Sequence, residues 1–368
     1  MSEQQHKMQR PPAEIQYAEQ LALLAELDNQ PRPPGWSLSL NAARRFILGD
    51  EKLGIERKIV ADVASIERML VTLATGRGLM LVGEPGTAKS MLSELLATAI
   101  SGTSSLTIQG GASITEDQIK YSWNYAMLIN EGPSLKALVP APLYQGMRDG
   151  KIVRFEEITR APLEVQDCLL GMLSDRVMTI PELNDDHNLL YAQEGFNIIG
   201  TANTRDRGVN EMSAALKRRF DFETVFPIMD FQQELDLVAT ASNRLLEKSA
   251  IPHTVPVEVL ELLVTTFRDL RGGEKSAGKG GGDSAMDRLT AVMSTAEAVN
   301  VAHAVGVRAW FLEQRSGEPA DLVECIAGTV VKDNADDRAK LRRYFEQKVA
   351  KKPGNHWRAY YQARHRLP

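Results

Sequence analysis

The chain has 368 residues, of which 43% are hydrophobic and 25% are charged. This balance is typical of a globular protein with a sizeable core, and it excludes a chain that is disordered throughout. No apolar run approaches the ~20 residues of a membrane-spanning helix, and the N-terminal sequence lacks the apolar core of a signal peptide. The two cysteines stand among apolar residues, which favours buried free thiols over a disulfide framework or a metal site. We therefore expect a cytoplasmic protein of about two domains with no membrane span.

The formal net charge of −5 is unevenly distributed along the chain. From residue 348 to the end the sequence holds six basic residues and no acidic one, so the remainder is strongly acidic. Trp357, Tyr360 and Tyr361 are interleaved with these basic side chains. Such a mixture can grip phosphates while stacking on bases, or it can dock on an acidic protein surface. We predict that residues 348–368, the basic tail, recognise a partner, and the acidic remainder favours a protein over nucleic acid.

The predicted elements begin with a polar, proline-rich segment, residues 1–36, which we interpret as a flexible arm with one short helix at 15–27. Apolar residues three and four positions apart predict a helix from about 59 to 75. Short apolar strands, with helical stretches between them, are then predicted at 78–82, 151–155 and 196–202. Strands that alternate with helices are typical of a parallel sheet covered by helices on both faces. Beyond about residue 230 the apolar pattern has the helical period, which predicts an all-α domain.

A glycine-rich segment joins the first predicted strand to a helix, which is the setting of a phosphate-binding loop. Its residues are Gly83, Glu84, Pro85, Gly86, Thr87, Ala88, Lys89 and Ser90. The glycines allow successive backbone N–H groups to point at one anion, and the helix N-terminus adds partial positive charge. Lys89 is expected to reach the β- and γ-phosphates of a nucleotide, and the Ser90 hydroxyl is expected to ligate Mg²⁺. Ala88 replaces the usual glycine, and we expect it to have helical φ and ψ because it starts the helix.

Polar side chains end the second and third strands at the edge of the sheet where ligands bind. Glu156 stands where an aspartate normally holds Mg²⁺ through its water shell, and Glu157 stands where a base polarises the attacking water. Asn203 follows the third strand and can orient this water or the γ-phosphate. The alternative for Asn203 is a residue that merely terminates a strand by turn chemistry. For the two glutamates the alternative is a pair of surface residues at the end of an ordinary strand.

Three arginines are candidates for contacts with nucleotide phosphates. Arg218 and Arg219 lie at a predicted helix end, where they either satisfy the last carbonyls of that helix or point to the nucleotide of an adjacent subunit. Arg288 follows a glycine-rich loop and falls in the first turn of a predicted helix. Because a cation there is unfavourable for the helix dipole, we interpret Arg288 as a contact for the phosphates rather than as a plain surface charge.

These motifs, in this order, resemble AAA+ ATPases of the MoxR type over residues 50 to 310. The shared features are GEPGTAKS, the acidic strand followed by Arg-Ala-Pro, the asparagine after FNIIGTA, and the helix end KRRF. The resemblance implies an α/β fold: a P-loop AAA+ module, with a parallel sheet flanked by helices, followed by an all-α lid domain. It also implies ATP and Mg²⁺ at the subunit interfaces of a hexameric ring that remodels or matures a separate protein client. MoxR-like proteins often work with a partner that carries a von Willebrand A domain.

The resemblance further implies two insertions that face the pore of the ring, at about 109–139 and 176–195. Two residues depart from the MoxR pattern, because Glu156 replaces aspartate and Thr159 replaces the asparagine usual before Arg-Ala-Pro. These departures bear on hydrolysis more than on nucleotide binding, so a nucleotide-gated scaffold with slow hydrolysis is one alternative. The sequence is also similar to the GTP-driven motor of modification-dependent restriction systems, which makes a nucleic-acid-associated motor another. The preference for ATP over GTP rests on the resemblance alone.

The motifs and the changes in composition together predict four segments. The boundaries are 1–36 for the flexible arm, 37–228 for the AAA+ nucleotide-binding domain, 229–315 for the all-α lid domain and 316–368 for a C-terminal helical extension. The extension ends in the basic tail. The lid contains the glycine-rich segment 271–283, which precedes the helix that carries Arg288.

Overall fold

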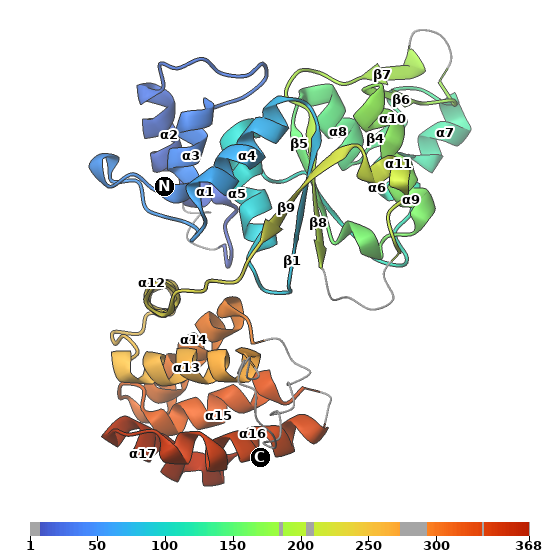
Figure 1. Ribbon diagram of the computed structural model, residues 1–368. Helices are drawn as coiled ribbons and strands as arrows, with labels where there is room; N and C mark the ends of the chain where they lie inside the picture. The colour runs from blue at the N-terminus through green and yellow to red at the C-terminus, as the bar shows by residue number, and fades with distance from the viewer. Residues whose placement is uncertain (1–7, 184–186, 204–209, 273–292, 333–334, 368) are drawn as a thin grey trace, which may run out of the picture. The chain divides into compact units, whose positions relative to one another are not determined.

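The computed structural model describes residues 8–183, 187–203, 210–272, 293–332 and 335–367 (Figure 1). The chain forms two compact units, Met1–Glu84 with Ala88–Val225 and Pro85–Thr87 with Phe226–Pro368. The first unit contains all the named strands, and the second is built from helices. Within the described ranges, every helix is too short or too polar to span a membrane.

The first unit is organised around a five-stranded sheet with the strand order β2-β5-β8-β1-β9. All neighbouring strands in this sheet run parallel. The strands are β1 (Gly78–Gly83), β2 (Thr107–Gln109), β5 (Ile152–Glu156), β8 (Asn197–Asn203) and β9 (Phe220–Val225). The three strands predicted from the sequence are β1, β5 and β8, which form the centre of the sheet. The two edge strands, β2 and β9, complete it.

Alternate side chains of the central strands enter two different cores, one on each face of the sheet. Leu79 and Leu81 of β1 pack with one group of helices, and Met80 between them packs with the other. The first group is α1 (Ala13–Gln16), α2 (Ala18–Leu27), α3 (Leu40–Leu48), α4 (Val63–Ala74) and α5 (Lys89–Ser101). The second group is α8 (Pro142–Asp149), α9 (Leu163–Asp167), α10 (Leu169–Ser174) and α11 (Ala214–Lys217). These layers confirm the predicted parallel sheet flanked by helices, because an apolar strand needs cover on both faces.

The N-terminal segment differs from the flexible arm that the sequence predicts over 1–36. Its helices α1 and α2 pack into the core of the first unit, and Tyr17 and Leu24 are buried there. The ammonium group of Lys58 lies 4.6 Å from the ring centre of Tyr17 and 4.3 Å from that of Phe46. A buried cation between two aromatic rings is stabilised by both ring faces. The polar composition of this segment conceals an apolar stripe that attaches it to the core.

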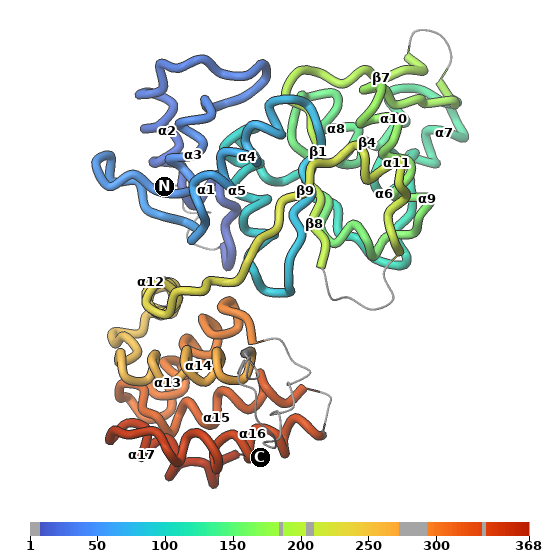
Figure 2. The backbone as a smooth tube through the Cα atoms, in the orientation of Figure 1, coloured from blue at the N-terminus to red at the C-terminus, as the bar shows by residue number. Residues whose placement is uncertain are grey.

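Two antiparallel hairpins stand where the sequence predicts insertions (Figure 2). The first contains β3 (Tyr121–Trp123) and β4 (Leu138–Pro140), with α7 (Tyr125–Glu131) between them and α6 (Glu116–Ile119) before them. The second contains β6 (Val177–Thr179) and β7 (Leu189–Tyr191). The Tyr121 hydroxyl donates to Oε2 of Glu182 at 2.9 Å, which ties the two insertions together. Both insertions lie on the side of the sheet that carries α8, away from α1 to α3 (Figure 2).

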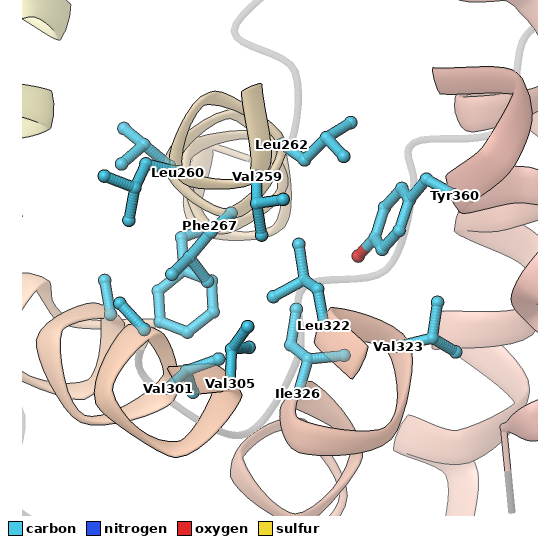
Figure 3. Close-up of a cluster of buried hydrophobic side chains, with 14 of the residues drawn as sticks. Val259, Leu260, Leu262, Phe267, Val301, Val305, Leu322, Val323, Ile326 and Tyr360 are labelled. Carbon is cyan, nitrogen blue, oxygen red and sulfur yellow. The ribbon is translucent and has the colours of Figure 1, made fainter. Parts of the chain in front are cut away.

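The second unit has a single apolar core that runs from Leu235 to Leu367. Its helices are α12 (Phe231–Lys248), α13 (Val257–Gly272), α14 (Thr295–Glu313), α15 (Pro319–Val330), α16 (Ala335–Gln347) and α17 (Asn355–Gln362). Figure 3 shows side chains from α13, α14, α15 and α17 converging in this core. The helical region after the sheet confirms the predicted all-α part of the fold. The boundary predicted between 315 and 316 falls inside this packed unit, because α14 and α15 share the core.

The basic tail, which the sequence analysis interprets as a recognition segment, also contributes to this core. Tyr360 is fully buried and points into the apolar cluster (Figure 3), and Trp357 is buried beside it. The ammonium group of Lys352 binds Oδ2 of Asp269 at 2.8 Å and lies over the Trp357 ring. The guanidinium of Arg366 pairs with Glu324 at 2.8 Å. Aromatic and basic side chains of the tail therefore serve the folding of the second unit.

Replacing Tyr360 with alanine tests this role of the tail. Truncation of a fully buried aromatic side chain leaves a cavity and is expected to cost about 3–5 kcal/mol of the free energy of unfolding. Equilibrium denaturation in urea measures that change. Arg358→Ala on the exposed side of the same helix α17 is the matched control and should leave stability nearly unchanged. A loss below about 1 kcal/mol for Tyr360→Ala would show that the tail is not part of the core.

Candidate nucleotide-binding site

The glycine-rich loop leaves the carboxyl end of β1 and enters α5, as the sequence predicts. Gly86 has φ 77° and Ala88 has φ 64° with ψ 25°, so both are left-handed. The expectation of helical φ and ψ at Ala88 is therefore wrong, because Ala88 is the N-cap residue that precedes the helix. Left-handed residues within a loop turn successive N–H groups toward one point, which creates an anion-binding concavity. A glycine at position 88 would adopt this conformation at no steric cost.

Lys89 is the first residue of α5 and is only 7% exposed. Its ammonium group donates to the carbonyl oxygens of Gly83 at 3.1 Å and Glu84 at 2.7 Å. These two bonds fold the side chain back over the loop from which it emerges. A positive charge at a helix N-terminus, together with converging N–H groups, fits the phosphates of a nucleotide.

Glu156 ends β5 and is 4% exposed, with both carboxylate oxygens engaged. Oε2 accepts from Ser90 Oγ at 2.7 Å and from Thr201 Oγ1 at 2.9 Å. Oε1 accepts from Ser93 Oγ at 2.6 Å and from Nη2 of Arg154 at 2.9 Å. The structure thus brings Ser90 and Glu156 together, as the sequence predicts. A surface glutamate at the end of an ordinary strand is incompatible with this burial.

Glu157 follows β5 with φ 54° and ψ 44°, a left-handed conformation that is uncommon outside glycine and asparagine. Its backbone N–H donates to Thr201 Oγ1 at 2.9 Å, which helps to hold this conformation. The carboxylate faces Asn203, whose Nδ2 lies 3.5 Å from Oε1 of Glu157. The carboxyl ends of β5 and β8 therefore present an acid and an amide together. Strained backbone of this kind is concentrated at functional sites.

Two further side chains contact Glu157 and escaped the sequence analysis. Gln109, at the end of β2, has Nε2 3.4 Å from Oε2 of Glu157. Arg160 has Nη1 3.1 Å from the same oxygen, and it stands in the Arg-Ala-Pro run that follows the acidic strand. The position of Gln109 was concealed because β2 has only three residues. The spacing of Arg160, three residues after Glu157 in a short helical turn, was the available signal.

The predicted arginines do not all lie near this edge of the sheet. Arg219 donates from Nε to Ser174 Oγ at 2.6 Å. The exposed side chain of Arg218 has no hydrogen-bond or ion-pair partner in the described part of the chain. Both precede β9, whose first residue Phe220 pairs with Gly78 at the amino end of β1. Arg288 lies outside the described residues.

The described residues offer neither a cluster of metal-ligating side chains nor a reactive thiol. No group of three histidine, cysteine, aspartate or glutamate side chains there could hold a metal ion. Burial raises the pKa of Cys168 to about 12 and that of Cys325 to about 11, so both free thiols stay protonated at neutral pH. The residues at the loop do fit a nucleotide-bound Mg²⁺, because the Ser90 hydroxyl donates to Glu156 and keeps its oxygen lone pairs.

Comparison with known families agrees with this geometry. Residues 78–220 match the family described as AAA domain (dynein-related subfamily). Residues 232–368 match the family described as YehL-like AAA+ ATPase C-terminal domain. The chain is therefore an AAA+ ATPase, which binds and hydrolyses ATP.

The chain belongs to the YehL-like family within this class. It is 76% identical over 369 residues to the protein YehL of Escherichia coli (strain K12), with 100% of both chains covered. The protein YojN of Bacillus subtilis (strain 168) is 26% identical over 166 residues, which are 43% of this chain and 51% of YojN. The crystal structure of NtrX from Brucella abortus in complex with ADP has a TM-score of 0.49 and 13% identity. That match covers 83% of this chain and 64% of NtrX.

Two substitutions of Ala88 test the left-handed conformation of the loop. Ala88→Gly should bind ATP as tightly as the wild type, because glycine adopts this conformation freely. Ala88→Val should weaken ATP binding by about tenfold, because a left-handed β-branched residue costs roughly 1–2 kcal/mol and displaces the loop. Titration with a fluorescent ATP analogue measures both affinities. Equal affinities for the valine variant and the wild type would contradict the left-handed assignment, since valine is tolerated in a helical conformation.

Proposed function

We propose that this chain forms a ring in which ATP and Mg²⁺ at subunit interfaces drive the remodelling of a separate protein client. The supporting observation is the meeting of Glu157 and Asn203 at the edge of the sheet where the phosphate-binding loop begins. Asn203 pairs directly with Gly83 in the register of β8 and β1, so the amide stands next to the start of the loop. This arrangement supplies a base and an orienting amide beside the terminal phosphate.

Each residue of the site has a distinct role in this proposal. Glu157 accepts a hydrogen bond from the attacking water, and Asn203 orients that water toward the γ-phosphate. Lys89 neutralises charge on the β- and γ-phosphates. Ser90, supported by Glu156, would hold Mg²⁺, which supplies further charge neutralisation when bound. Arg288 remains a proposed phosphate contact.

Arg218 is the residue that we propose to act on the neighbouring subunit. It precedes β9 at the amino end of the sheet, whereas the loop leaves β1 at the carboxyl end, at Gly83. With a rise of roughly 3.3 Å per residue, the two ends of β1 are about 16 Å apart, which exceeds the reach of an arginine side chain. We therefore assign the exposed guanidinium of Arg218 to the nucleotide of an adjacent subunit, since it does not reach the loop of its own chain. Arg219 is the weaker candidate because Ser174 already holds it.

Exposed apolar side chains on the insertions support a protein client. On α7, Tyr125 is 70% exposed and Ile129 is 83% exposed, and their spacing of four residues puts them on one side of the helix. Tyr191 on the second insertion is 62% exposed. Exposed apolar side chains that share one side of a helix, as Tyr125 and Ile129 do, favour a site of protein contact. The sequence resemblance favours remodelling of the MoxR type, with a client that carries a von Willebrand A domain.

The alternative of a nucleic-acid motor loses part of its support, and what remains for it is the resemblance to the GTP-driven motor and the half-buried Tyr361. Besides that resemblance, it rested on aromatic residues of the basic tail that could stack on bases. Trp357 and Tyr360 are buried in the core of the second unit and are not available for stacking. The remaining acidic character of the chain favours a protein partner.

Glu157→Gln tests the assignment of the base. We expect ATP affinity to stay within about threefold of the wild type and turnover to fall by roughly 100-fold or more, the range for loss of a general base. Steady-state ATP hydrolysis and nucleotide titration measure the two quantities. Glu164→Gln, exposed on the nearby helix α9, is the control and should hydrolyse ATP at the wild-type rate. Turnover that is undiminished in Glu157→Gln would remove Glu157 from the mechanism.

Mixing two inactive variants tests whether Arg218 acts on its neighbour. Arg218→Ala and Glu157→Gln should each be inactive alone, because each lacks one part of every interface. In mixed rings, an intact Glu157 of one subunit meets an intact Arg218 of the next, so activity should return. ATPase assays across mixing ratios measure this recovery, with Arg219→Ala as the matched control that retains activity unmixed. No recovery at any ratio would contradict action across the interface.

A further inference from the structure

Arg154 and Glu156 form a charge pair in the interior of the first unit, between β5 and α5. They are 8% and 4% exposed, and both point to the same face of β5 because they are two residues apart. A basic residue inside a buried strand is strongly unfavourable unless its charge is compensated. The compensating carboxylate is that of Glu156, which also holds Ser90. Through Ser90, the proposed Mg²⁺ ligand, the pair is connected to the nucleotide site as well as to the core of the unit.

The guanidinium of Arg154 is satisfied at each of its N–H groups. The acceptors are Ser93 Oγ at 3.0 Å, Ser104 O at 3.3 Å, Thr107 Oγ1 at 3.3 Å, Ser90 O at 3.0 Å and Glu156 Oε1 at 2.9 Å. These acceptors come from α5, from the segment before β2, from β2 and from β5. A planar fork of donors can serve them all, whereas the compact ammonium of lysine cannot. Arg154 is thus fixed in one orientation.

Glu156 has no acceptor site left for a further donor. An ionised carboxylate offers about four lone-pair positions. Arg154, Ser93, Ser90 and Thr201 occupy them. Ser93 Oγ also lies 2.9 Å from Ser90 O, but its single hydrogen favours the shorter contact with the charged oxygen. Glu156 would therefore act on a bound cation through the Ser90 hydroxyl, and its own charge is already balanced by Arg154.

We propose that Arg154 is a positioning residue that sets the affinity of the site for a divalent cation. It holds the glutamate, one methylene longer than aspartate, in the orientation that receives the Ser90 hydroxyl. Its fixed positive charge also opposes a second cation nearby, so the site requires more Mg²⁺ than it would without Arg154. This proposal rests on the proposed function, in which ATP binds at this loop together with Mg²⁺.

Single and double substitutions of the pair test the proposal. The measured quantity is the Mg²⁺ concentration that half-saturates binding of ATP at fixed concentration, in the Glu157→Gln background to prevent turnover. Arg154→Met should lower it by roughly tenfold, because the lost positive charge outweighs the loss of one of the four contacts that hold Glu156. Glu156→Gln should raise it, because it changes the local charge in the opposite direction. The double variant restores neutrality and should return to within about threefold of the parent. Thermal unfolding of the same proteins without nucleotide reports their stability separately.

An Arg154→Met variant that is less stable but needs the same Mg²⁺ concentration as its parent would overturn the proposal. If Arg154→Met does not fold, Glu156→Gln is compared with the neutral double variant. A lower Mg²⁺ requirement in the double variant supports the proposal, and an equal one overturns it. ATP binding that is independent of Mg²⁺ in the parent protein would instead contradict the proposed function, and the proposal with it.

Discussion

A charge pair shut off from water, Arg154 with Glu156, joins the sheet to the helix that follows the phosphate-binding loop. Arg154 on β5 donates hydrogen bonds to Ser90 and Ser93 on α5. Glu156 accepts hydrogen bonds from the hydroxyl groups of the same two serines. Removing one partner of such a pair leaves a buried charge uncompensated, so each partner fixes the other. The start of α5 is thereby held against β5. The loop that precedes α5, and the cation site proposed at Ser90, depend on this attachment.

The parallel register of the sheet gathers the remaining chemistry. β8 lies between β1 and β5. Asn203 at its carboxyl end therefore stands between the phosphate-binding loop and the two glutamates, Glu156 and Glu157. Thr201 on β8 links the two glutamates, because its hydroxyl donates to Glu156 and accepts from the backbone N–H of Glu157. One threonine therefore supports the burial of the first glutamate and the left-handed backbone of the second. The residues proposed for catalysis stand at the ends of strands, and the helices on both faces hold these strands in place.

The sequence predicts the central strands and the meeting of Glu157 with Asn203, because long apolar runs and polar strand ends are strong local signals. It does not predict β2, since Thr107–Gln109 is too short to show a period. Nor does it predict the left-handed Ala88, because backbone conformation at a helix start is decided by the loop as a whole. The burial of Tyr360 could have been found. Trp357, Tyr360 and Leu367 belong to a helix-spaced apolar stripe that the basic residues around them obscured.

The most direct test of the nucleotide site is an experimental structure of the Glu157→Gln protein with ATP and Mg²⁺. The γ-phosphate is expected between Lys89 and Asn203, with Ser90 Oγ on the metal while its hydrogen bond to Glu156 remains. Arg154 is expected to stay on Oε1 of Glu156, and Arg218 of an adjacent subunit to approach the phosphate. A nucleotide bound away from the loop, or a Glu156 carboxylate that leaves Arg154 to contact the metal directly, would contradict this arrangement.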